Sequence, residues 1–451
     1  MVDYDSDLPS EMSKEDVPEV LEQIQRKSFD YFLEEYNPDN GLVADTTGPN
    51  SPSSIAAAGF ALSCYPIGVY EGWLEREDAA ERTVQALRFF WRSKQSRAAD
   101  ATGYKGFFYH FLDMKTGRRF RQSELSTIDT ALLLGGMLIA RAYFDDADDP
   151  VEREIDELVN KVYERVDWNW ARNGGATVTM GWQPEHGFLR ARWQGYDESL
   201  LLYLLALASP SHPIPPESYL ASVAEYHWTE AYGYDYLYAG PLFTHQYPHV
   251  WIDFRGIQDE FMREHDSTYF ENSRRATYIQ REYAIDNPRG FKEYGPYFWG
   301  ITASDGPGPV LVEVDGKEQR YFGYVGRGVP YGPDDGTIAP WVVATSLPFA
   351  PEIVLPTLGH FNEMNLHSAG NDDYGYQATV NPTFPRDEGD DPWWTSDVHY
   401  GINQGPLILM VQNYQTNFFW NLTKKCGEIY SGLQAAGFRG GWLEDNPAEE
   451  S

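Results

Sequence analysis

Apolar residues recur at helical spacing along most of the chain. In the segment VPEVLEQIQRKSFDYFLEEY, one helical face carries Val20, Ile24, Phe29 and Phe32. Similar patterns predict helices at about 54–72, 77–94, 127–143, 151–166, 197–208, 216–225, 253–264, 267–286, 340–347 and 404–425. Breakers such as GPGP and VPYGPDDG separate them. Because strands do not alternate regularly with these helices, the pattern predicts an all-α fold rather than a doubly wound sheet.

The chain offers few signs of division. No fixed-period repeat or Pro/Ser/Gly-rich linker is visible, so we expect one closed helical domain over residues 16–443. Residues 1–15 are predicted to be a disordered acidic lead, and residues 444–451 an acidic tail. The pieces PVLVEVDG and KEQRYFGY predict a small β-hairpin. The stretch 365–392 is predicted to be a long surface loop serving a site.

Composition limits the classes of partner. The 451 residues include 14 Trp, 31 Tyr and 24 Phe, which is far more apolar surface than a non-folding chain carries. With 35 basic against 68 acidic residues, the formal charge is −33. Binding to nucleic acid or to an anionic membrane surface needs clustered Lys and Arg, and no such cluster is visible. The sequence therefore predicts neither partner.

The acidic surface also predicts a working environment. At low salt the carboxylates would repel one another, whereas molar salt shortens the Debye length to about 3 Å and removes that penalty. We therefore expect a salt-adapted protein of the haloarchaeal type. The acidic start MVDYDSDLPSEMSKED lacks the basic and apolar regions of a signal peptide, so we expect a cytoplasmic protein.

Several kinds of chemistry have no motif in this chain. Its cysteines, Cys64 and Cys426, are far apart and show no metal-binding spacing. No GxGxxG after a strand, P-loop or GxSxG is present, so nucleotide-dependent and serine-hydrolase functions lack support. We expect no cofactor.

Aromatic residues crowd into loops and loop–helix junctions. They include Trp168, Trp170, Trp182, Trp193, Trp251, Trp299, Trp341, Trp393 and Trp394. Indole faces stack on the apolar faces of sugar rings, and neighbouring polar side chains can bind the sugar hydroxyls. The mixture predicts a glycan-binding cleft, in which Trp299 and Trp393 are candidate substrate-binding residues. The alternative is that these rings pack in the core and seal the loops.

Carboxylates recur at predicted helix starts. They are Glu124 and Asp129 in QSELSTIDTALLLGG, Asp197 and Glu198 in RWQGYDESLLLYLL, Asp334 and Asp335 in PYGPDDGTIAPW, and Asp397 in PWWTSDVHYGINQGP. In a helical barrel the inner helices begin at one end, where their dipoles favour anions, so these acids are expected to converge on one cleft. Helix capping alone explains an Asp at such a place, and we assign it to Asp197. Glu198 lies one position further in and is predicted to line the cleft.

Histidines raise the question of a metal. His245 and His249 stand at i, i+4 spacing, but Pro248 disfavours a continuous helix there, and no HExxH pattern accompanies them. His186 is isolated from them in the sequence. We expect no metal site, and assign His245 to sugar hydroxyl contact or to local structure.

Long stretches of the chain resemble a known family. They are GFFYHFLDMKTGRRF, SELSTIDTALLLGG, HQYPHVWIDFRGIQDEFM, YFENSRRATY, WGITASDGPGP, DDGTIAPWVVATSLPFAPEIVLP and GLQAAGFRGGWL. Together these motifs, collinear over about residues 20–443, resemble the glucoamylase-like family. That family includes the glycoside hydrolase family 144 β-1,2-glucanases and a domain of cyclic β-1,2-glucan synthases.

The resemblance implies an (α/α)6 barrel with an acidic cleft that hydrolyses β-1,2-linked glucans with inversion and without a cofactor. The carboxylate motifs of the family fall on Glu124, Asp129, Glu198 and Asp335. Its polar and aromatic cleft residues fall on Arg255, Trp299, Asp305 and Gln404. Hydrolysis of a glycosidic bond needs one protonated carboxyl and one carboxylate. We expect Glu198 to be the acid and Asp397 or Asp129 to be the base.

One segment departs from the family pattern. Its members usually read GIDQGP followed by IENYRSG, whereas this chain reads GINQGP and VQNYQTN. Asn403 and Gln412 thus replace two acids, and Gln415 replaces an Arg. If the usual Asp at 403 is the base, its loss would lower the rate by about 10²- to 10⁴-fold, unless Asp397 or Asp335 substitutes.

Three functions are compatible with these observations. The leading one is a glycoside hydrolase acting on a β-linked glucan or gluco-oligosaccharide, with short chains favoured. The second is a glycan-binding protein that kept the cleft, including Asn403, and lost turnover. The third is a transglycosylase on the same scaffold.

Overall fold

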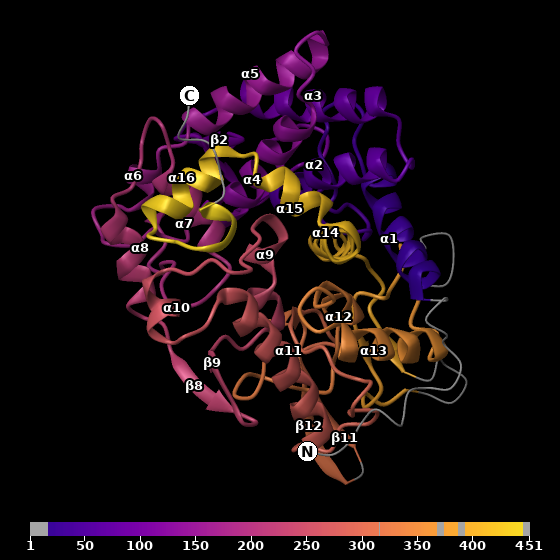
Figure 1. Ribbon diagram of the computed structural model, residues 1–451. Coiled ribbons are helices and arrows are strands. Elements are labelled where there is room, and N and C mark those ends of the chain that lie inside the picture. Colours follow the sequence, from indigo (N-terminus) through magenta and orange to yellow (C-terminus); the bar gives the residue numbers. More distant parts are fainter. Residues whose placement is uncertain (1–16, 315, 368–373, 387–392, 445–451) are drawn as a thin grey trace.

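The computed structural model describes residues 17–314, 316–367, 374–386 and 393–444, which are mostly helical with small antiparallel sheets (Figure 1). The predicted disordered lead lies outside the described residues, as does the predicted acidic tail apart from Glu444. Within the described ranges, no helix has both the length and the apolar character needed to cross a membrane.

An inner set of helices is buried over most of its length. It comprises α2 (Ile55–Tyr70), α4 (Thr127–Tyr143), α7 (Leu200–Leu207), α9 (Tyr247–Trp251), α12 (Pro340–Thr345) and α14 (Gly401–Thr416). Helix α2 packs against α4 and α14, α7 packs against α4 and α9, and α12 packs against α14. Helices α2, α4 and α7 are apolar on nearly all sides, and such helices are stable only when protein surrounds them, which accounts for their inner position.

Other helices pack outside this set. They are α1 (Val17–Glu34), α3 (Arg76–Arg92), α5 (Pro150–Glu164), α8 (Pro216–Val223), α11 (Tyr269–Asp286), α13 (Pro351–Glu363) and α16 (Gly427–Ala435). Helix α1 packs on α14, α3 on α2, α13 on α12 and α16 on α7. Two layers of helices are what an (α/α)6 fold requires, while closure into a barrel stays a prediction.

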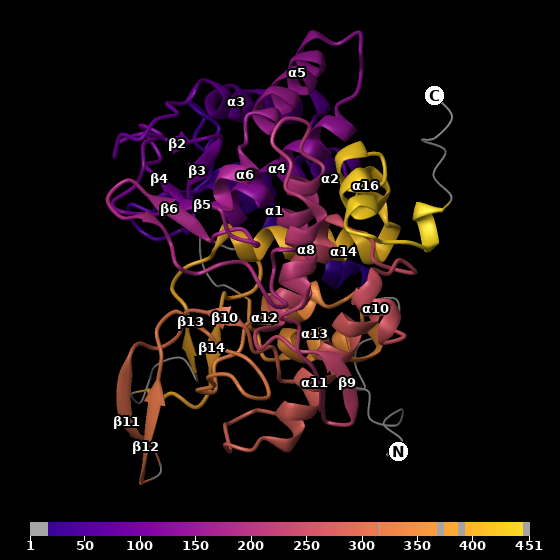
Figure 2. The ribbon, with the colours of Figure 1, turned by 90° about the vertical axis from the view of Figure 1, so that its left-hand side faces the viewer.

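In Figure 2 several of the small sheets lie on one side of the helices, whereas β9 (Tyr234–Leu237) lies away from them. A 5-stranded antiparallel sheet has the order β2-β3-β5-β6-β7. Its strands are β2 (Gly103–Tyr104), β3 (Phe107–Tyr109), β5 (Leu125–Ser126), β6 (Gly181–Gln183) and β7 (Gly187–Phe188). The hairpin predicted from the sequence is confirmed as β11 (Val310–Val314) with β12 (Lys317–Tyr321), in the register Val310 opposite Tyr321.

The remaining elements are short. The paired strands are β1 (Ser53–Ser54) with β4 (Phe111–Leu112), β8 (Trp228–Ala231) with β9 (Tyr234–Leu237), β10 (Ala303–Ser304) with β13 (Val325–Gly326), and β14 (Val380–Asn381) with β15 (Trp394–Thr395). The short helices are α6 (Trp168–Ala171), η1 (Leu242–His245), α10 (Glu260–Glu264), α15 (Phe418–Thr423) and η2 (Gly441–Leu443). An all-α description is therefore too simple, because these strands shape the connections between helices.

Some predicted elements differ from the structure. The helix predicted at 253–264 is only α10, because Ile252 is extended and Gly256 has a φ of +73°. Helix α13 was not predicted, and it contains Pro351 in its first turn, where proline is tolerated, and Pro356 in its interior. In the predicted surface loop at 365–392, residues 374–383 are almost entirely buried, and residues 368–373 and 387–392 lie outside the described ranges.

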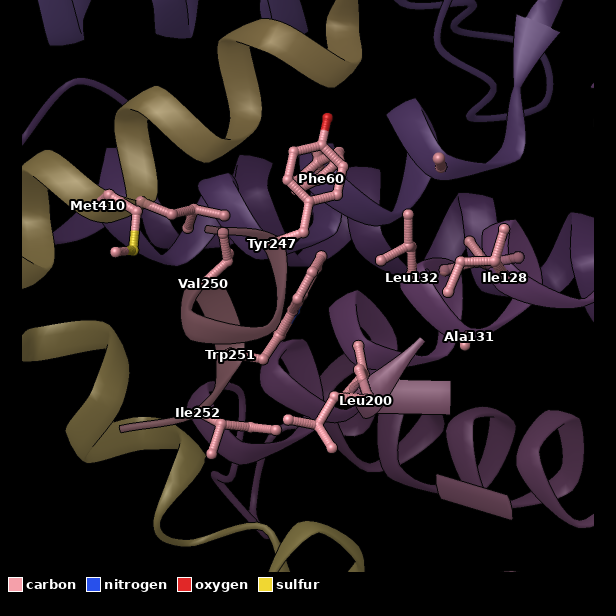
Figure 3. Close-up of a cluster of buried hydrophobic side chains, with 14 of the residues drawn as sticks. Phe60, Ile128, Ala131, Leu132, Leu200, Tyr247, Val250, Trp251, Ile252 and Met410 are labelled. Carbon is pink, nitrogen blue, oxygen red and sulfur yellow. The ribbon is translucent and has the colours of Figure 1, made fainter. Parts of the chain in front are cut away.

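An aromatic cluster joins the inner helices (Figure 3). Trp251 of α9 stacks on Phe60 of α2 with ring centroids 5.3 Å apart, and Phe60 meets Tyr247 edge to face. Ile128 and Leu132 of α4 belong to the same core. Tyr247, Ile128 and Leu132 also line a cavity, so the cluster forms part of the wall of that cavity.

Glycines allow α2 and α4 to approach closely. A β-carbon at Gly136 would lie 2.0 Å from the carbonyl oxygen of Gly59. Replacing Gly136 with Ala is therefore expected to lower the free energy of unfolding by about 1–3 kcal/mol through overpacking. The control is Gly427→Ala, because a β-carbon at Gly427 meets no atom within 4 Å. Urea denaturation measures both variants, and equal stabilities would contradict the close approach.

Candidate active site

Several inner helices begin at one cavity of about 350 Å³. Its wall includes residues at the starts of α2, α4, α12 and α14, together with side chains from η1 and α9. The prediction that helix starts converge on a cleft is thus confirmed for these helices, and their dipoles favour anions there. The cavity carboxylates are Asp45, Asp129 and Glu198, and the aromatic lining residues are Phe111, Phe243, Tyr247, Tyr324, Trp341 and Tyr400.

Asp129 is fixed in the first turn of α4. The Ser126 hydroxyl caps this helix by accepting a hydrogen bond from the Asp129 backbone N–H at 3.2 Å. The same hydroxyl donates to Oδ2 of Asp129. Reciprocal bonding of this kind holds both the helix start and the carboxylate in place. Asp129 is therefore held in position at the cavity wall.

His110 connects the cavity to Glu124, and sequence reasoning overlooked it. Its Nδ1 lies 2.8 Å from Oε1 of Glu124, and its Nε2 lies 3.6 Å from Oδ2 of Asp129. Strands β3 and β5 bring these residues together, and the His110 backbone N–H donates to the Glu124 carbonyl. Burial alone would lower the pKa of His110, but Asp129, Glu124 and Asp45 outweigh it and raise the pKa to about 9. At neutral pH His110 is a cation among carboxylates.

Glu198 precedes α7 and is half-buried at the cavity wall. Burial, together with the charges of Asp197 and Asp129, raises the pKa of Glu198 to about 8. Glu198 thus holds its proton at neutral pH and can donate it. Asp197 accepts a hydrogen bond from the Ser199 backbone N–H at 2.9 Å. The N-cap of α7 is Ser199, so the prediction that Asp197 caps this helix is wrong, and Glu198 lies before the helix rather than inside it.

Asp45 is a cavity carboxylate that the sequence did not indicate. It lies in the connection after α1, and its carbonyl accepts a hydrogen bond from Gly401 N–H at 3.0 Å, at the start of α14. Burial, reinforced by Asp129 and opposed by His110, raises the pKa of Asp45 to about 6. The segment GLVADTTGP carries no catalytic spacing that could have revealed it.

Tyr324 lines the same cavity as Asp45, Asp129 and Glu198. Its side chain lines the cavity although the residue is 60% exposed, so it stands at the cavity mouth. Burial of the hydroxyl, with the charges of Asp45, Asp305 and Glu198 among others, raises the pKa of Tyr324 to about 12. The hydroxyl therefore remains a hydrogen-bond donor beside the cavity acids.

Asn403 and Gln412, which stand where the sequence resemblance implies acids, have different surroundings. Asn403 lines the cavity from the first turn of α14. Gln412 is buried at the other end of the helix, where it accepts a hydrogen bond from Gln25 at 2.9 Å and donates to Glu71 at 2.9 Å. Only the change at Asn403 therefore bears on the cavity, and Gln412 belongs to a structural amide pair.

Asp335 and Asp305 lie outside the cavity wall. Asp335 is completely buried and accepts hydrogen bonds from Nε and Nη2 of Arg327, both at 2.8 Å. This bidentate ion pair accounts for an acid at position 335, because both carboxylate oxygens bind Arg327 and neither lies in the cavity wall. Asp305 accepts hydrogen bonds from Thr379 at 2.9 Å and from Ser396. Burial raises the pKa of Asp305, although these bonds oppose the shift.

Other predicted substrate-binding residues also lie away from the cavity wall. Trp299 is fully buried and donates to Thr357 Oγ1 at 3.0 Å. His245 is buried beside the Ala239 carbonyl, and burial lowers its pKa to about 4. Arg255 pairs with Asp253 and lies over the Trp420 ring. These contacts account for each residue structurally.

The last predicted residues lie near α14. Asp397 is exposed and outside the cavity wall, while Trp393 is partly buried against the core. Gln404 is buried and lies 3.3 Å from His399 Nδ1. Of the tryptophans predicted to line a cleft, Trp341 alone lies in the described cavity wall, where tyrosine and phenylalanine rings predominate. Most of the other indoles pack against the core.

The described residues offer no metal site. Within them, no group of three or more His, Cys, Asp or Glu side chains is arranged to hold an ion. His249 illustrates the reason, because it is fully buried and meets the Ser273 hydroxyl at 2.9 Å. The cavity is lined instead by separate carboxylates and one imidazole.

Comparison with known proteins identifies the family. The fold matches a putative glucoamylase from Bacteroides uniformis with a TM-score of 0.82 and 27% identity, over 96% of this chain and 100% of that one. The endo-β-1,2-glucanase of Chitinophaga pinensis, solved with sophorotriose and glucose, matches with a TM-score of 0.81 and 24% identity, over 94% and 99% of the two chains. The family model described as putative glucoamylase matches residues 190–427, and this chain belongs to that family.

A curated relative is also similar. It is the exo β-1,2-glucooligosaccharide sophorohydrolase (non-reducing end) of Parabacteroides distasonis, 25% identical over 450 residues. The match covers 92% of this chain and 57% of the relative, so the chain spans little more than half of that protein's length.

Proposed function

We propose that this protein is a glycoside hydrolase that cleaves β-1,2-linked gluco-oligosaccharides by carboxylate acid–base catalysis with inversion. The observation that carries the proposal is the cavity itself. It sets Glu198, which holds its proton at neutral pH, beside the carboxylates of Asp129 and Asp45. Glycoside hydrolysis requires this pairing of a protonated and an ionised carboxyl. The β-1,2-glucan linkage is supported by the similarity to the sophorohydrolase and the endo-β-1,2-glucanase.

The residues have distinct tasks in this proposal. Glu198 donates its proton to the leaving oxygen of the scissile bond. Asp129, held by Ser126 and His110, stabilises the positive charge that develops on the sugar ring. Electrostatic stabilisation of that kind requires no reorganisation, because the carboxylate is already fixed. Aromatic rings such as Tyr247 and Tyr324 offer faces to the sugar.

The cavity size bears on the chain length of the substrate. Its volume of about 350 Å³ lies near the lower end of the range of ligand pockets, about 300–1,000 Å³. We propose that short oligosaccharides, rather than long polymers, occupy it.

A glycan-binding protein without turnover is the second candidate. The observation that favours it is Asn403, an amide in the cavity wall, at the position where the sequence resemblance implies an aspartate. An amide can bind a sugar hydroxyl or a water molecule, but it cannot accept a proton at neutral pH. Under this alternative, Asn403→Asp would create activity that the natural chain lacks.

A panel of substrates tests the proposed function. We expect reducing sugar from β-1,2-gluco-oligosaccharides, and none from β-1,3- or α-1,4-linked ones, in about 2–3 M KCl to screen the acidic surface. The anomeric configuration of the first product, followed by NMR, should be opposite to that of the substrate. Bound but uncleaved oligosaccharide would reject the hydrolase and favour the binding protein.

A further inference from the structure

Asp45 stands in the cavity wall as an accessible carboxylate. In the part of the chain that the structure describes, its side chain accepts no hydrogen bond from protein, although its backbone is firmly held. Its N–H donates to the Pro52 carbonyl at 2.7 Å, and its carbonyl accepts from Gly401 N–H at 3.0 Å. Both carboxylate oxygens are therefore available to a molecule in the cavity, and two hydrogen bonds hold the backbone of Asp45.

The neighbour of Asp45 in the cavity wall is the start of α14. The residue after Asp45, Thr46, forms a bridge with Tyr400, and Asn403 follows in the first turn of the helix. Asn403 is 7% exposed and lines the cavity. Its amide can orient a water molecule but cannot remove a proton from it, so another group must act as the base.

The other acids are poorly suited to that task. Oδ2 of Asp129 already accepts a hydrogen bond from Ser126 and lies 3.6 Å from His110 Nε2. Asp397 is exposed to solvent outside the cavity wall. Glu198 holds its proton and is the donor. Asp45 is the remaining carboxylate in the described wall of the cavity.

We propose that Asp45 is the general base that activates the hydrolytic water, and that the Asn403 amide orients this water. The inference rests on the proposed function and names a base for it. Asp45 takes one proton from water as the water oxygen bonds to the anomeric carbon. The glycosidic C–O bond breaks, its electron pair goes to the leaving oxygen, and that oxygen receives the proton of Glu198. Exchange with solvent then restores both carboxyls.

The protonation of Asp45 suits this role. Burial raises the pKa of Asp45 to about 6, with Asp129 adding to the shift and His110 opposing it. The other titratable groups that interact with Asp45 are the hydroxyls of Tyr31, Tyr324 and Tyr400. A base must be ionised, so activity is expected to rise with pH through about 6. Asp129 also raises the pKa of Glu198, so it interacts with both the acid and the base.

The test compares two kinds of substrate. One is a β-1,2-gluco-oligosaccharide, whose leaving oxygen needs a proton, and the other is the corresponding glycosyl fluoride, whose leaving group does not. Asp45→Ala is expected to lower kcat by about 10²- to 10⁴-fold on both. Glu198→Gln should be impaired on the oligosaccharide and much less on the fluoride. Added azide or formate should partly restore Asp45→Ala and leave Glu198→Gln unchanged.

Controls separate the possible failures. Asp39→Ala, an exposed aspartate in the same connection, should behave as wild type. Asp45→Asn keeps the side-chain shape, and its circular dichroism and urea midpoint show whether folding is intact. If Asp45→Ala and Asp45→Asn cleave the substrate as well as the wild type does, Asp45 is not the base. Rescue of Asp129→Ala or Asp397→Ala by azide, in place of Asp45→Ala, would contradict the proposal in the same way. A wild type that cleaves neither substrate rejects the proposed function and the base together.

Discussion

Replacing Glu198 with glutamine is expected to lower kcat for gluco-oligosaccharide hydrolysis by about 10²- to 10⁴-fold, because the leaving oxygen then receives no proton in the transition state. The amide has nearly the shape of the carboxyl, so KM should change much less than kcat. Initial rates of reducing-sugar release at several substrate concentrations measure both constants. Glu77→Gln is the control, because this exposed residue of α3 carries the same chemical change away from the cavity.

The pH profile gives an independent readout of Glu198. Its pKa is raised to about 8, so the proton is present below that pH and lost as the pH rises through it. Wild-type kcat should therefore fall on the alkaline side near pH 8. The residual activity of Glu198→Gln should lack this alkaline decline. If the variant kept the wild-type rate, or the wild-type alkaline limb, the acid would have to be another group.

Much of the helical framework was predictable because burial leaves a strong periodic signal. The inner helices α2 and α4 are apolar on nearly all sides, and their predicted ranges agree with the structure to within a few residues. The predicted convergence of helix starts also brought Asp129 and Glu198 to one cavity. For Asp129, position at a helix start was sufficient information, whereas Glu198 lies just before α7 rather than inside the helix predicted at 197–208.

Other site residues depend on contacts that leave no pattern in the sequence. His110 reaches the cavity through the pairing of β3 with β5, and these strands are too short to show alternation. The motif GFFYHFLDMKTGRRF contains His110, so a polar residue among aromatics was the available signal. Asp45 depends on a loop that meets α14 across more than three hundred residues of sequence. Only tertiary structure reveals such a neighbour.

Asp335 was a catalytic candidate from its motif, but the structure places it in a buried ion pair with Arg327, outside the cavity wall. Replacing Asp335 with asparagine is expected to lower the free energy of unfolding by about 3–5 kcal/mol, because the fully buried guanidinium of Arg327 loses its counter-charge. Urea denaturation measures this loss. Asp100→Asn, which breaks an exposed pair with Lys94, is the control and should leave the midpoint nearly unchanged.

Salt distinguishes the two ion pairs further. Molar KCl screens the exposed pair, whereas the pair of Arg327 with Asp335 lies beyond the reach of solvent ions. The destabilisation by Asp335→Asn should therefore persist at high salt. Adding Arg327→Met to Asp335→Asn should recover part of the stability, since it removes the uncompensated charge. A variant Asp335→Asn with wild-type stability but no hydrolysis would contradict this role and return Asp335 to the catalytic candidates.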